Sequence, residues 1–475
     1  MSHRLTAAVA TALCVFAGAV ALVAWFSCSS GRAVAVRRQT ALEAGTATST
    51  VAEAEVVDIR GSFEKFDGAT SSIPGAWPRF RGAAFDNIVR DSPPLADRWP
   101  EGGPKALWSV DLGEGYAGPA VWEGRVYLLD YDEKRQGDAL RCFSLDDGRE
   151  IWRRWYKVHV KRNHGMSRTV PAVADGVVVT IGPRCHVMCV DARSGDFKWG
   201  LDLVREFGTQ VPMWYTGQCP LVENGVAVMA PGGSALLIGV DVQTGRVVWK
   251  TPNPHAWNMS HASVMPMEFA GRRAYVYAAI GGVAGVAADG NERGAVLWES
   301  AEWNHAVVSP SPVPLADGRI LLTAGYGVGS RMMQVQQTNS GFAVRSLFPL
   351  DRQVFACEQH TPLFYQGHLF TVLPSDAGAR KQQLVCMTPE GRVTWASGEA
   401  YRYGLGPFMI ADGKLFMLDD NGKLSLLRAS AERFERLAEA KVLSGVEAWA
   451  PLALVQGRLL ARDRNRMVCL DVAAR

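Results

Sequence analysis

The sequence shows no excess of charge of one sign and no block of basic residues. Its 50 Lys and Arg residues are balanced by 47 Asp and Glu residues, which leaves a net charge of +3 over 475 residues. Proteins that bind nucleic acid concentrate Lys and Arg in a patch or stripe. We therefore expect no nucleic-acid partner.

Motifs for metal binding and nucleophilic catalysis are also missing. The nine histidines form no H-x-H or H-E-x-x-H pattern, and neither G-x-S-x-G nor C-x-x-C-H is present. These spacings place two ligands on one metal, expose a nucleophilic serine at a sharp turn, or attach a haem. The sequence thus predicts no metal site and no catalytic residues.

A long apolar run occurs at the N-terminus. Residues 5–26 are 22 residues without a charge, which is long enough to cross a bilayer. The apolar core of a cleavable signal peptide is usually shorter, so residues 1–31 are predicted to hold an uncleaved membrane anchor. Two alternatives stay open: cleavage near Ala33-Val-Ala35, and lipidation of Cys28.

The next stretch lacks any sustained hydrophobic period. Residues 32–75 are rich in Ala, Thr, Ser, Gly and acidic residues, a composition typical of a flexible tether. The folded domain is predicted to cover residues 76–475. It would begin at Trp77-Pro-Arg-Phe-Arg-Gly82, an aromatic and basic stretch expected to lie against the outside of that domain.

A repeated turn followed by a strand organises the rest of the chain. It is most complete at Asp241-Val-Gln-Thr-Gly-Arg-Val-Val-Trp249, where Asp, Thr and Gly favour a tight turn and the β-branched residues favour a strand. Its tryptophan recurs after 47, 50, 49 and then 97 residues, at Trp152, Trp199, Trp249, Trp298 and Trp395. The missing copy is predicted at Gly341–Phe348. A fixed period of this length indicates a repeat architecture.

A second pattern marks the start of each repeat: an apolar stretch, usually opened by Pro, then a short turn with Gly and an apolar strand. It begins at Pro119, Pro171, Pro220, Val264, Pro312, Pro362, Pro407 and Pro451. Each copy predicts a β-hairpin, and most continue into two further strands. Eight units of four antiparallel strands predict an all-β fold, an eight-bladed β-propeller.

The two ends of the repeat array predict how the ring closes. The eighth unit ends after Cys469-Leu-Asp471 without a fourth strand, while an unassigned strand at residues 106–111 precedes the first unit. Trp108 lies 44 residues before Trp152, in the repeat position. We predict that this N-terminal strand completes the last blade, because closure leaves no open sheet edge.

The cysteine positions follow the same repeat. Cys142, Cys189, Cys386 and Cys469 occupy equivalent places in four units. Equivalent positions in different blades are too far apart for disulfides, so these are expected to be buried core residues. Cys185 and Cys189 are about 13 Å apart along a strand, which supports neither a disulfide nor a metal site.

With these motifs, the chain resembles the PQQ-repeat, or quinoprotein-like, β-propeller family, nearest to its BamB-like bacterial branch. The resemblance runs from WPRFRG at residue 77 through PMWYTGQCPLV and APGGSALLIGVDVQTGRVVW to CLDV at residue 469. The family includes dehydrogenases that use pyrroloquinoline quinone (PQQ) with calcium, assembly scaffolds and sensor domains. The chain departs from the dehydrogenases in lacking their adjacent Cys-Cys pair, and no calcium-ligand set is evident.

In a propeller, the loops before the first strand of each blade surround one mouth of the central channel. Read backwards from each repeat start, these loops supply aromatic, imidazole and guanidinium groups suited to stacking and hydrogen bonding. The predicted ligand-binding residues are Arg168, Trp214, Tyr215, His261, His305, His360 and Trp449. The alternative is that they fill a narrow channel and satisfy one another.

Two functions remain open. The favoured one is a membrane-tethered, monomeric propeller outside the cytoplasm that binds a protein or envelope-saccharide partner without catalysis or cofactor. It would be anchored in the inner membrane through residues 5–26. The alternative is a quinoprotein oxidoreductase with PQQ and calcium in the channel. The location follows from the family resemblance, because the flanking charges do not settle the orientation.

Overall fold

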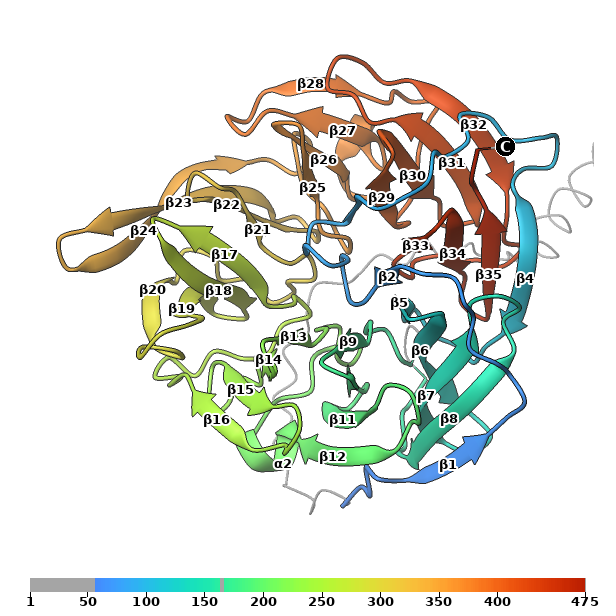
Figure 1. Ribbon diagram of the computed structural model, residues 1–475. Coiled ribbons are helices and arrows are strands. Elements are labelled where there is room, and N and C mark those ends of the chain that lie inside the picture. Colours follow the sequence, from blue (N-terminus) through green and yellow to red (C-terminus); the bar gives the residue numbers. More distant parts are fainter. Residues whose placement is uncertain (1–55, 163–165, 475) are drawn as a thin grey trace, which may run out of the picture. The chain divides into compact units, whose positions relative to one another are not determined.

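The computed structural model describes residues 56–162 and 166–474. These residues form eight sheets arranged around a central axis (Figure 1). The predicted all-β, eight-bladed propeller is therefore confirmed. The predicted anchor lies outside the described residues, and within them no helix is long and apolar enough to cross a membrane.

In blades 1 to 4 the strands run outward from the channel in chain order. Their bounds are β5 Ala120–Trp122, β6 Arg125–Asp132, β7 Gly137–Ser144 and β8 Glu150–Lys157; β9 Ala172–Ala174, β10 Val177–Ile181, β11 His186–Asp191 and β12 Phe197–Asp202; β13 Leu221–Glu223, β14 Val226–Met229, β15 Ile238–Asp241 and β16 Val247–Lys250; β17 Met265–Phe269, β18 Arg272–Ala279, β19 Gly282–Ala287 and β20 Val296–Ser300. A short helix, α2 (Leu203–Phe207), follows blade 2.

Blades 5 to 8 follow the same plan. Their bounds are β21 Val313–Pro314, β22 Arg319–Ala324, β23 Gly329–Thr338 and β24 Gly341–Leu350; β25 Leu363–Tyr365, β26 His368–Val372, β27 Leu384–Met387 and β28 Val393–Ala396; β29 Phe408–Ala411, β30 Lys414–Leu418, β31 Lys423–Arg428 and β32 Arg436–Lys441; β33 Ala453–Val455, β34 Arg458–Arg462, β35 Arg466–Asp471 and β4 Lys105–Asp111. A 3-10 turn, η1 (Gly378–Arg380), lies within blade 6.

The ring closes as predicted. β4 pairs antiparallel with β35, and Trp108 lies opposite Cys469. Trp152 lies opposite Cys142 in the same way, beside the same irregularity in register. The N-terminal strand thus supplies the outer strand that the C-terminal blade lacks.

Four of the repeat tryptophans, Trp108, Trp152, Trp199 and Trp249, pack on the turn glycine of the next blade. A Cβ on Gly148 would lie 2.6 Å from the Trp108 ring, and one on Gly245 would lie 2.6 Å from Trp199. At several junctions the indole N–H also donates to a carbonyl of that turn, at 3.0 Å from Trp108 to Leu145 and 2.8 Å from Trp199 to Val242. The close fit requires glycine. A single Gly-x-x-x-Trp motif can therefore contact both neighbouring blades, as Gly195 meets Trp152 on one side and Trp199 meets Gly245 on the other.

The repeat tryptophans differ in burial. Trp152, Trp199 and Trp298 are buried, whereas Trp249 and Trp395 are half-buried. The Trp249 indole N–H has no hydrogen-bond partner, because the next blade has a longer turn there, at residues 288–294. The missing copy is confirmed as β24, where Phe348 takes the place of tryptophan, opposite Met332.

The cysteine prediction also holds. All seven described cysteines are buried and none forms a disulfide. Cys142, Cys189, Cys386 and Cys469 each lie opposite the repeat tryptophan of their blade. They act as small core residues.

The N-terminal flank corrects two predictions. Ser62–Lys65, inside the predicted tether, forms β1 and pairs with β8 as a fifth strand outside blade 1. The Trp77–Gly82 stretch lies in the channel instead of on the outside: β2 (Ala76–Trp77) pairs with the innermost strand β5, and Trp77 is 3% exposed. An inner strand leaves one row of backbone groups unpaired toward the channel, and this stretch satisfies part of that row.

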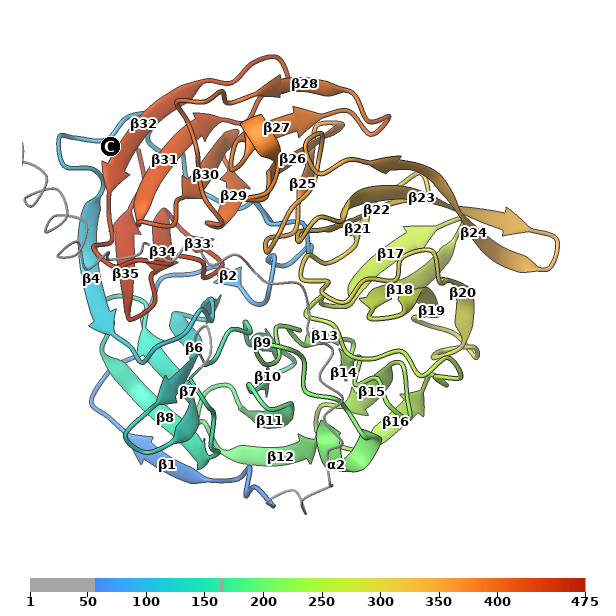
Figure 2. The same cartoon turned by 180° about the vertical axis from the view of Figure 1, so that it is seen from behind.

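The segment Ala76–Arg90, here called the strap, crosses the ring near its centre (Figures 1 and 2). Pro78 accepts a backbone bond from Val173 of blade 2, at 2.7 Å. Further on, β3 (Ile88–Val89) pairs in parallel with β29 of blade 7. The strap therefore joins inner strands that are far apart in the sequence.

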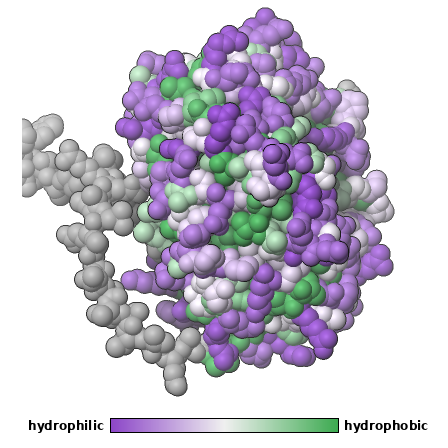
Figure 3. Space-filling model, turned by 90° about the vertical axis from the view of Figure 1, so that its left-hand side faces the viewer, coloured by the Kyte–Doolittle hydropathy of each residue, from purple (hydrophilic) through white to green (hydrophobic). Residues whose placement is uncertain are grey.

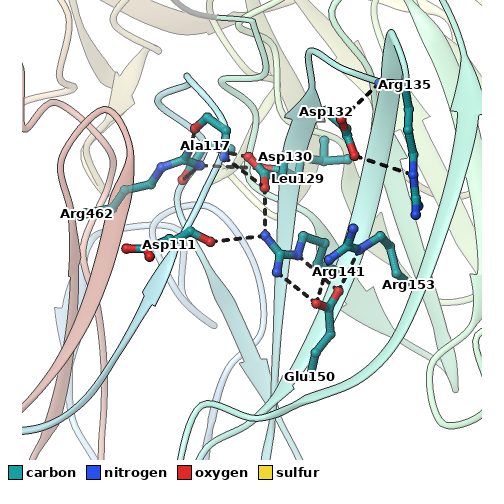
Figure 4. A network of polar contacts seen from close by, with 11 residues as sticks. Asp111, Ala117, Leu129, Asp130, Asp132, Arg135, Arg141, Glu150, Arg153 and Arg462 are labelled. Carbon is teal, nitrogen blue, oxygen red and sulfur yellow. Dashed lines mark hydrogen bonds and ion pairs between the residues drawn. The ribbon is translucent and has the colours of Figure 1, made fainter. Parts of the chain in front are cut away.

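Ion pairs reinforce the closure between blade 8 and blade 1 (Figure 4). Arg462 of β34 is fully buried and donates to the carbonyls of Gly113, Ala117 and Leu129 at 3.0–3.4 Å. Its guanidinium lies 3.7 Å from the Asp130 carboxylate, and Asp130 also forms an ion pair with Arg141 at 2.9 Å. The two ends of the repeat array are thus joined by polar contacts as well as by β4.

The outer wall is a water-facing surface. Figure 3, which looks onto the side of β20 and β24, shows hydrophobic patches separated by hydrophilic ones. The exposed apolar side chains of the outer strands include Val248 and Val296, at 52% and 37% exposure. Buried side chains are concentrated in the inner three strands of each blade.

Candidate functional site

A chain of side-chain hydrogen bonds joins the inner strands of blades 2 to 6. The Val170 amide donates to the Cys219 thiol, and the Cys219 amide donates to the Ser263 hydroxyl. The Ser263 amide donates in turn to the Ser311 hydroxyl, and the Ser311 amide donates to the Thr361 hydroxyl. Each of the three bonds to a hydroxyl is 2.9 Å long. These residues occupy the same place in successive blades, at the start of the first strand. They hold the neck of the channel at a fixed width.

Above this neck, Arg168 lies among aromatic side chains. Its guanidinium is 5.9 Å from the Tyr116 ring centre, and the phenols of Tyr215 and Tyr326 are near enough to act on its charge. Burial lowers the pKa of Arg168 to about 10, so it stays protonated at neutral pH. Burial, together with the charge of Arg168, lowers the pKa of His261 to about 3, which makes that imidazole neutral.

Trp214 extends this aromatic group. Its ring stacks on His261 at 6.2 Å between centres and lies 5.7 Å from Tyr326. Trp214 and Tyr215 both have left-handed backbone conformations, with φ of 63° and 70°. Bulky side chains rarely adopt this conformation, and the Tyr215 hydroxyl is held by the carbonyl of Lys161 at 2.5 Å. The loop thus presents two aromatic rings at the mouth.

Trp449 belongs to the opposite half of the mouth. Its ring centre lies 5.1 Å from that of Tyr116, and its indole N–H donates to Asp420 at 2.8 Å. The Tyr116 hydroxyl donates to Glu447 at 2.5 Å. Tyr116 therefore connects Trp449 with Arg168, and the predicted residues of the two halves meet through it.

His360 lies deeper, toward the strap. Burial lowers the pKa of His360 to about 4, and the nearby charge of Arg81 acts in the same direction. Hydrogen bonds with the backbone of Leu405 and Trp449 act in the opposite direction. Arg81 of the strap is 5% exposed and donates to the carbonyls of Thr361 and Pro362 at 3.0 and 3.1 Å. The strap thus reaches the underside of the mouth.

His305 does not join the others. Its ring packs edge-on against Trp303 at 4.5 Å, and the nearest charge is Arg331 of β23. The structure thus brings together Arg168, Trp214, Tyr215, His261, His360 and Trp449, and places His305 elsewhere.

The sequence analysis missed Tyr326 and three carboxylates, Glu358, Asp420 and Glu447. Tyr326 and Asp420 come from loops between second and third strands, which lie on the same face as the loops before first strands because the strands are antiparallel. That alternation was the signal that could have found them. The carboxylates have partners: Ser375 donates to Glu358 at 3.2 Å, and Arg464 lies 3.5 Å from Glu447.

The carboxylates at the mouth do not form a cation site. Across residues 56–162 and 166–474, no three His, Cys, Asp or Glu side chains come together in a way that could hold a metal ion. Burial raises the pKa of Glu358 and of Asp420. The chemistry on offer is stacking, hydrogen bonding and one fixed guanidinium charge.

The fold is an eight-bladed propeller, and the comparisons with known proteins concern this fold and one stretch of the sequence. Residues 135–346 match the family model described as outer membrane protein assembly factor BamB, which confirms the predicted resemblance over that range. A search of curated proteins found no match.

Solved structures share the fold at low identity. A europium-containing methanol dehydrogenase is 11% identical with a TM-score of 0.57, covering 83% of this chain and 89% of its own. The quinohemoprotein alcohol dehydrogenase ADHIIG from Pseudomonas putida HK5 is 12% identical with a TM-score of 0.52, covering 85% and 81%. BamB from Moraxella catarrhalis is 13% identical with a TM-score of 0.49, covering 77% and 99%. At such identities the likeness concerns the fold alone.

Proposed function

We propose that this chain is a non-catalytic binding propeller that docks a protein partner at the channel mouth in an assembly of the cell envelope. The observation that carries the proposal is the composition of the mouth: its carboxylates Glu358, Asp420 and Glu447 are engaged by Ser375, Trp449 and Tyr116, and aromatic rings gather there around the Arg168 guanidinium. The family match to an outer membrane protein assembly factor supports a protein partner. We further propose that residues 5–26 tether the propeller outside the cytoplasm.

The alternative is a PQQ-dependent oxidoreductase. PQQ carries carboxylates, and Arg168 could pair with one of them. The calcium that accompanies PQQ in dehydrogenases needs several clustered oxygen ligands, and the described residues offer no such group. Asp420 is already bonded to the Trp449 indole and the Leu405 amide. The residues of the mouth therefore do not fit a quinone-calcium pair.

An activity assay separates the two functions. The purified protein, supplied with PQQ and calcium, is expected to give no alcohol- or sugar-dependent reduction of an artificial electron acceptor. An absorbance spectrum of the protein as isolated checks for bound quinone. Dye reduction that appears on reconstitution and disappears with a chelator would establish the alternative.

A substitution tests the mouth as the docking site. Trp214→Ala removes a ring that stacks on His261, and we expect at least a tenfold loss of partner retention in crosslinked envelope extracts, because interface aromatics carry much of the binding energy. Trp122→Ala is the matched control, since Trp122 lies beside the first hairpin turn of blade 1, on the opposite face. Equal retention by both variants would exclude the mouth.

Membrane fractionation tests the proposed tether. The full-length chain is expected in the membrane fraction and to resist extraction by high salt, because an apolar segment of this length inserts stably. A soluble protein whose N-terminus lies near Ala35 would show that the segment is a cleaved signal peptide.

A further inference from the structure

A cavity of about 350 Å³ lies between the strap and the inner strands of blades 4, 5 and 6. Its lining includes Phe85, Asp86 and Arg90 from the strap, and Gln366 from the first hairpin turn of blade 6. That turn faces away from the mouth. The size is within the range of small-ligand sites, about 300–1,000 Å³.

Prolines explain why the strap leaves this space open. In antiparallel hairpins every second residue of the innermost strand turns its backbone groups toward the channel. The strap uses two of these positions, through the amides of Val173 and Ile410. The corresponding positions of β17 and β21 hold Pro266 and Pro314, which have no N–H to donate.

These prolines leave hydrogen-bond acceptors without donors. Pro266, Pro312 and Pro314 line the cavity. In the strand registers Pro266 lies opposite Tyr275 and Pro314 opposite Ile320, and outside the strand ladders no hydrogen bond between described residues engages the carbonyls of the three prolines. Pro312 is buried and Pro266 and Pro314 are half-buried, so a guest that shields their carbonyls from water without donating to them leaves costly unpaired acceptors. A ligand that fits here must therefore supply N–H groups.

The neighbouring blades show which donor suits such carbonyls. On blade 3 the Arg79 guanidinium donates to the carbonyl of Val222 at 2.8 Å. On blade 6 the Arg81 guanidinium donates to the carbonyl of Pro362 at 3.1 Å. The strap thus fills the positions on either side of blades 4 and 5 with arginine side chains.

The cavity lining holds one carboxylate, Asp86, and two guanidinium groups, Arg81 and Arg90, so a cationic guest depends on Asp86 and on the aromatic rings. The Asp86 carboxylate lies in the lining, where it pairs with Arg90, whose side chain is 58% exposed. The Tyr365 ring offers a π face to a cation, while the Phe85 ring already carries the Arg79 guanidinium at 5.0 Å from its centre. The Arg81 guanidinium is already engaged by three carbonyls, those of Phe85, Thr361 and Pro362. An incoming cation would compete with Arg90 for Asp86.

We propose that this cavity is a second binding site, which receives a basic side chain, arginine in the first place, from a partner polypeptide. The guest donates to the open proline carbonyls of blades 4 and 5 and pairs with Asp86. The site does not depend on what the mouth binds.

The proposal makes opposite predictions for two neighbouring residues. The probe is a capped pentapeptide of glycine with one central arginine, titrated into the full-length protein by calorimetry at low salt. Asp86→Asn is expected to weaken binding about tenfold, because hydrogen-bonded charge pairs are the stronger ones. Arg90→Gln is expected to strengthen it several-fold, since it removes the internal competitor. Ala84→Phe, at an exposed lining position, is expected to block the cavity.

Controls keep the test separate from the mouth. The same peptide with citrulline, an uncharged isostere, should bind at least tenfold more weakly, and Trp214→Ala should leave binding of the arginine peptide unchanged. Citrulline binding as tight as arginine, binding unaffected by Ala84→Phe, or no binding at millimolar peptide would each overturn the proposal. A loss with Trp214→Ala alone would place the peptide at the mouth instead.

Discussion

Replacing Arg462 by methionine is expected to lower the free energy of unfolding by about 3–5 kcal/mol, the range for breaking a buried ion pair from one side. Arg462 is 0% exposed and donates to carbonyls of Gly113, Ala117 and Leu129 (Figure 4). Methionine fills a similar volume but leaves these carbonyls without their donor and removes one of the two guanidinium groups beside Asp130. Urea denaturation at neutral pH measures the loss.

A matched control lies four residues further on. Arg466 is 50% exposed and lies 3.7 Å from the fully accessible Asp111, so Arg466→Met should change stability by less than about 1 kcal/mol. Asp130 keeps its ion pair with Arg141 at 2.9 Å in the Arg462→Met variant, so the loss reports chiefly on the carbonyls that Arg462 serves. A loss below about 1 kcal/mol for Arg462→Met would mean that β4 alone holds the ring closed.

The sequence predicted the ring because its main signals repeat. A turn glycine and a tryptophan recur at fixed spacing because, at four junctions, the indole of one blade packs on the glycine of the next. One substituted copy, Phe348, did not hide the period. The strap could not be placed in this way, because its contacts with Val173 and Ile410 are made by backbone groups and leave no repeated side-chain signal.

The site was predictable only in part for a related reason. Loop position relative to each repeat located Arg168, Trp214, His261 and Trp449 at one mouth. Which of these side chains meet depends on how each loop bends, and His305 illustrates the limit: it packs on Trp303, the preceding aromatic of its own loop. Glu358 and Glu447 lie in the same loops as His360 and Trp449, and Asp420 comes from the loop between β30 and β31; none was evident because no local motif marks them.

The second large effect concerns a buried carboxylate below the mouth. Asp138 of β7 is 0% exposed and accepts hydrogen bonds from Ser167 at 2.6 Å and Tyr156 at 2.9 Å. Burial raises its pKa to about 6, although both hydrogen bonds act in the opposite direction; the nearby Asp130 adds to the rise. Ionising Asp138 therefore costs more free energy in the folded protein than in the unfolded chain.

The sign of the pH dependence follows from this pKa. Because the folded-state pKa exceeds the unfolded value of 3.8, the favourable contribution of protonated Asp138 is complete below pH 4 and is lost as pH rises to 6. Two pKa units correspond to about 3 kcal/mol. Asp138→Asn, which resembles the protonated acid, should therefore gain about 3 kcal/mol relative to the wild type between pH 4 and pH 7.

Comparing the two proteins across pH isolates this carboxylate. His186 packs edge-on against Tyr156 at 5.6 Å, and burial lowers its pKa, so its own titration changes stability in the opposite direction. It is present in both proteins and largely cancels in their difference. Tyr156→Phe removes a donor to the carboxylate and should move the loss of stability to higher pH. A difference between Asp138→Asn and the wild type that stays constant from pH 4 to pH 7 would show that Asp138 is ionised at little cost in the fold.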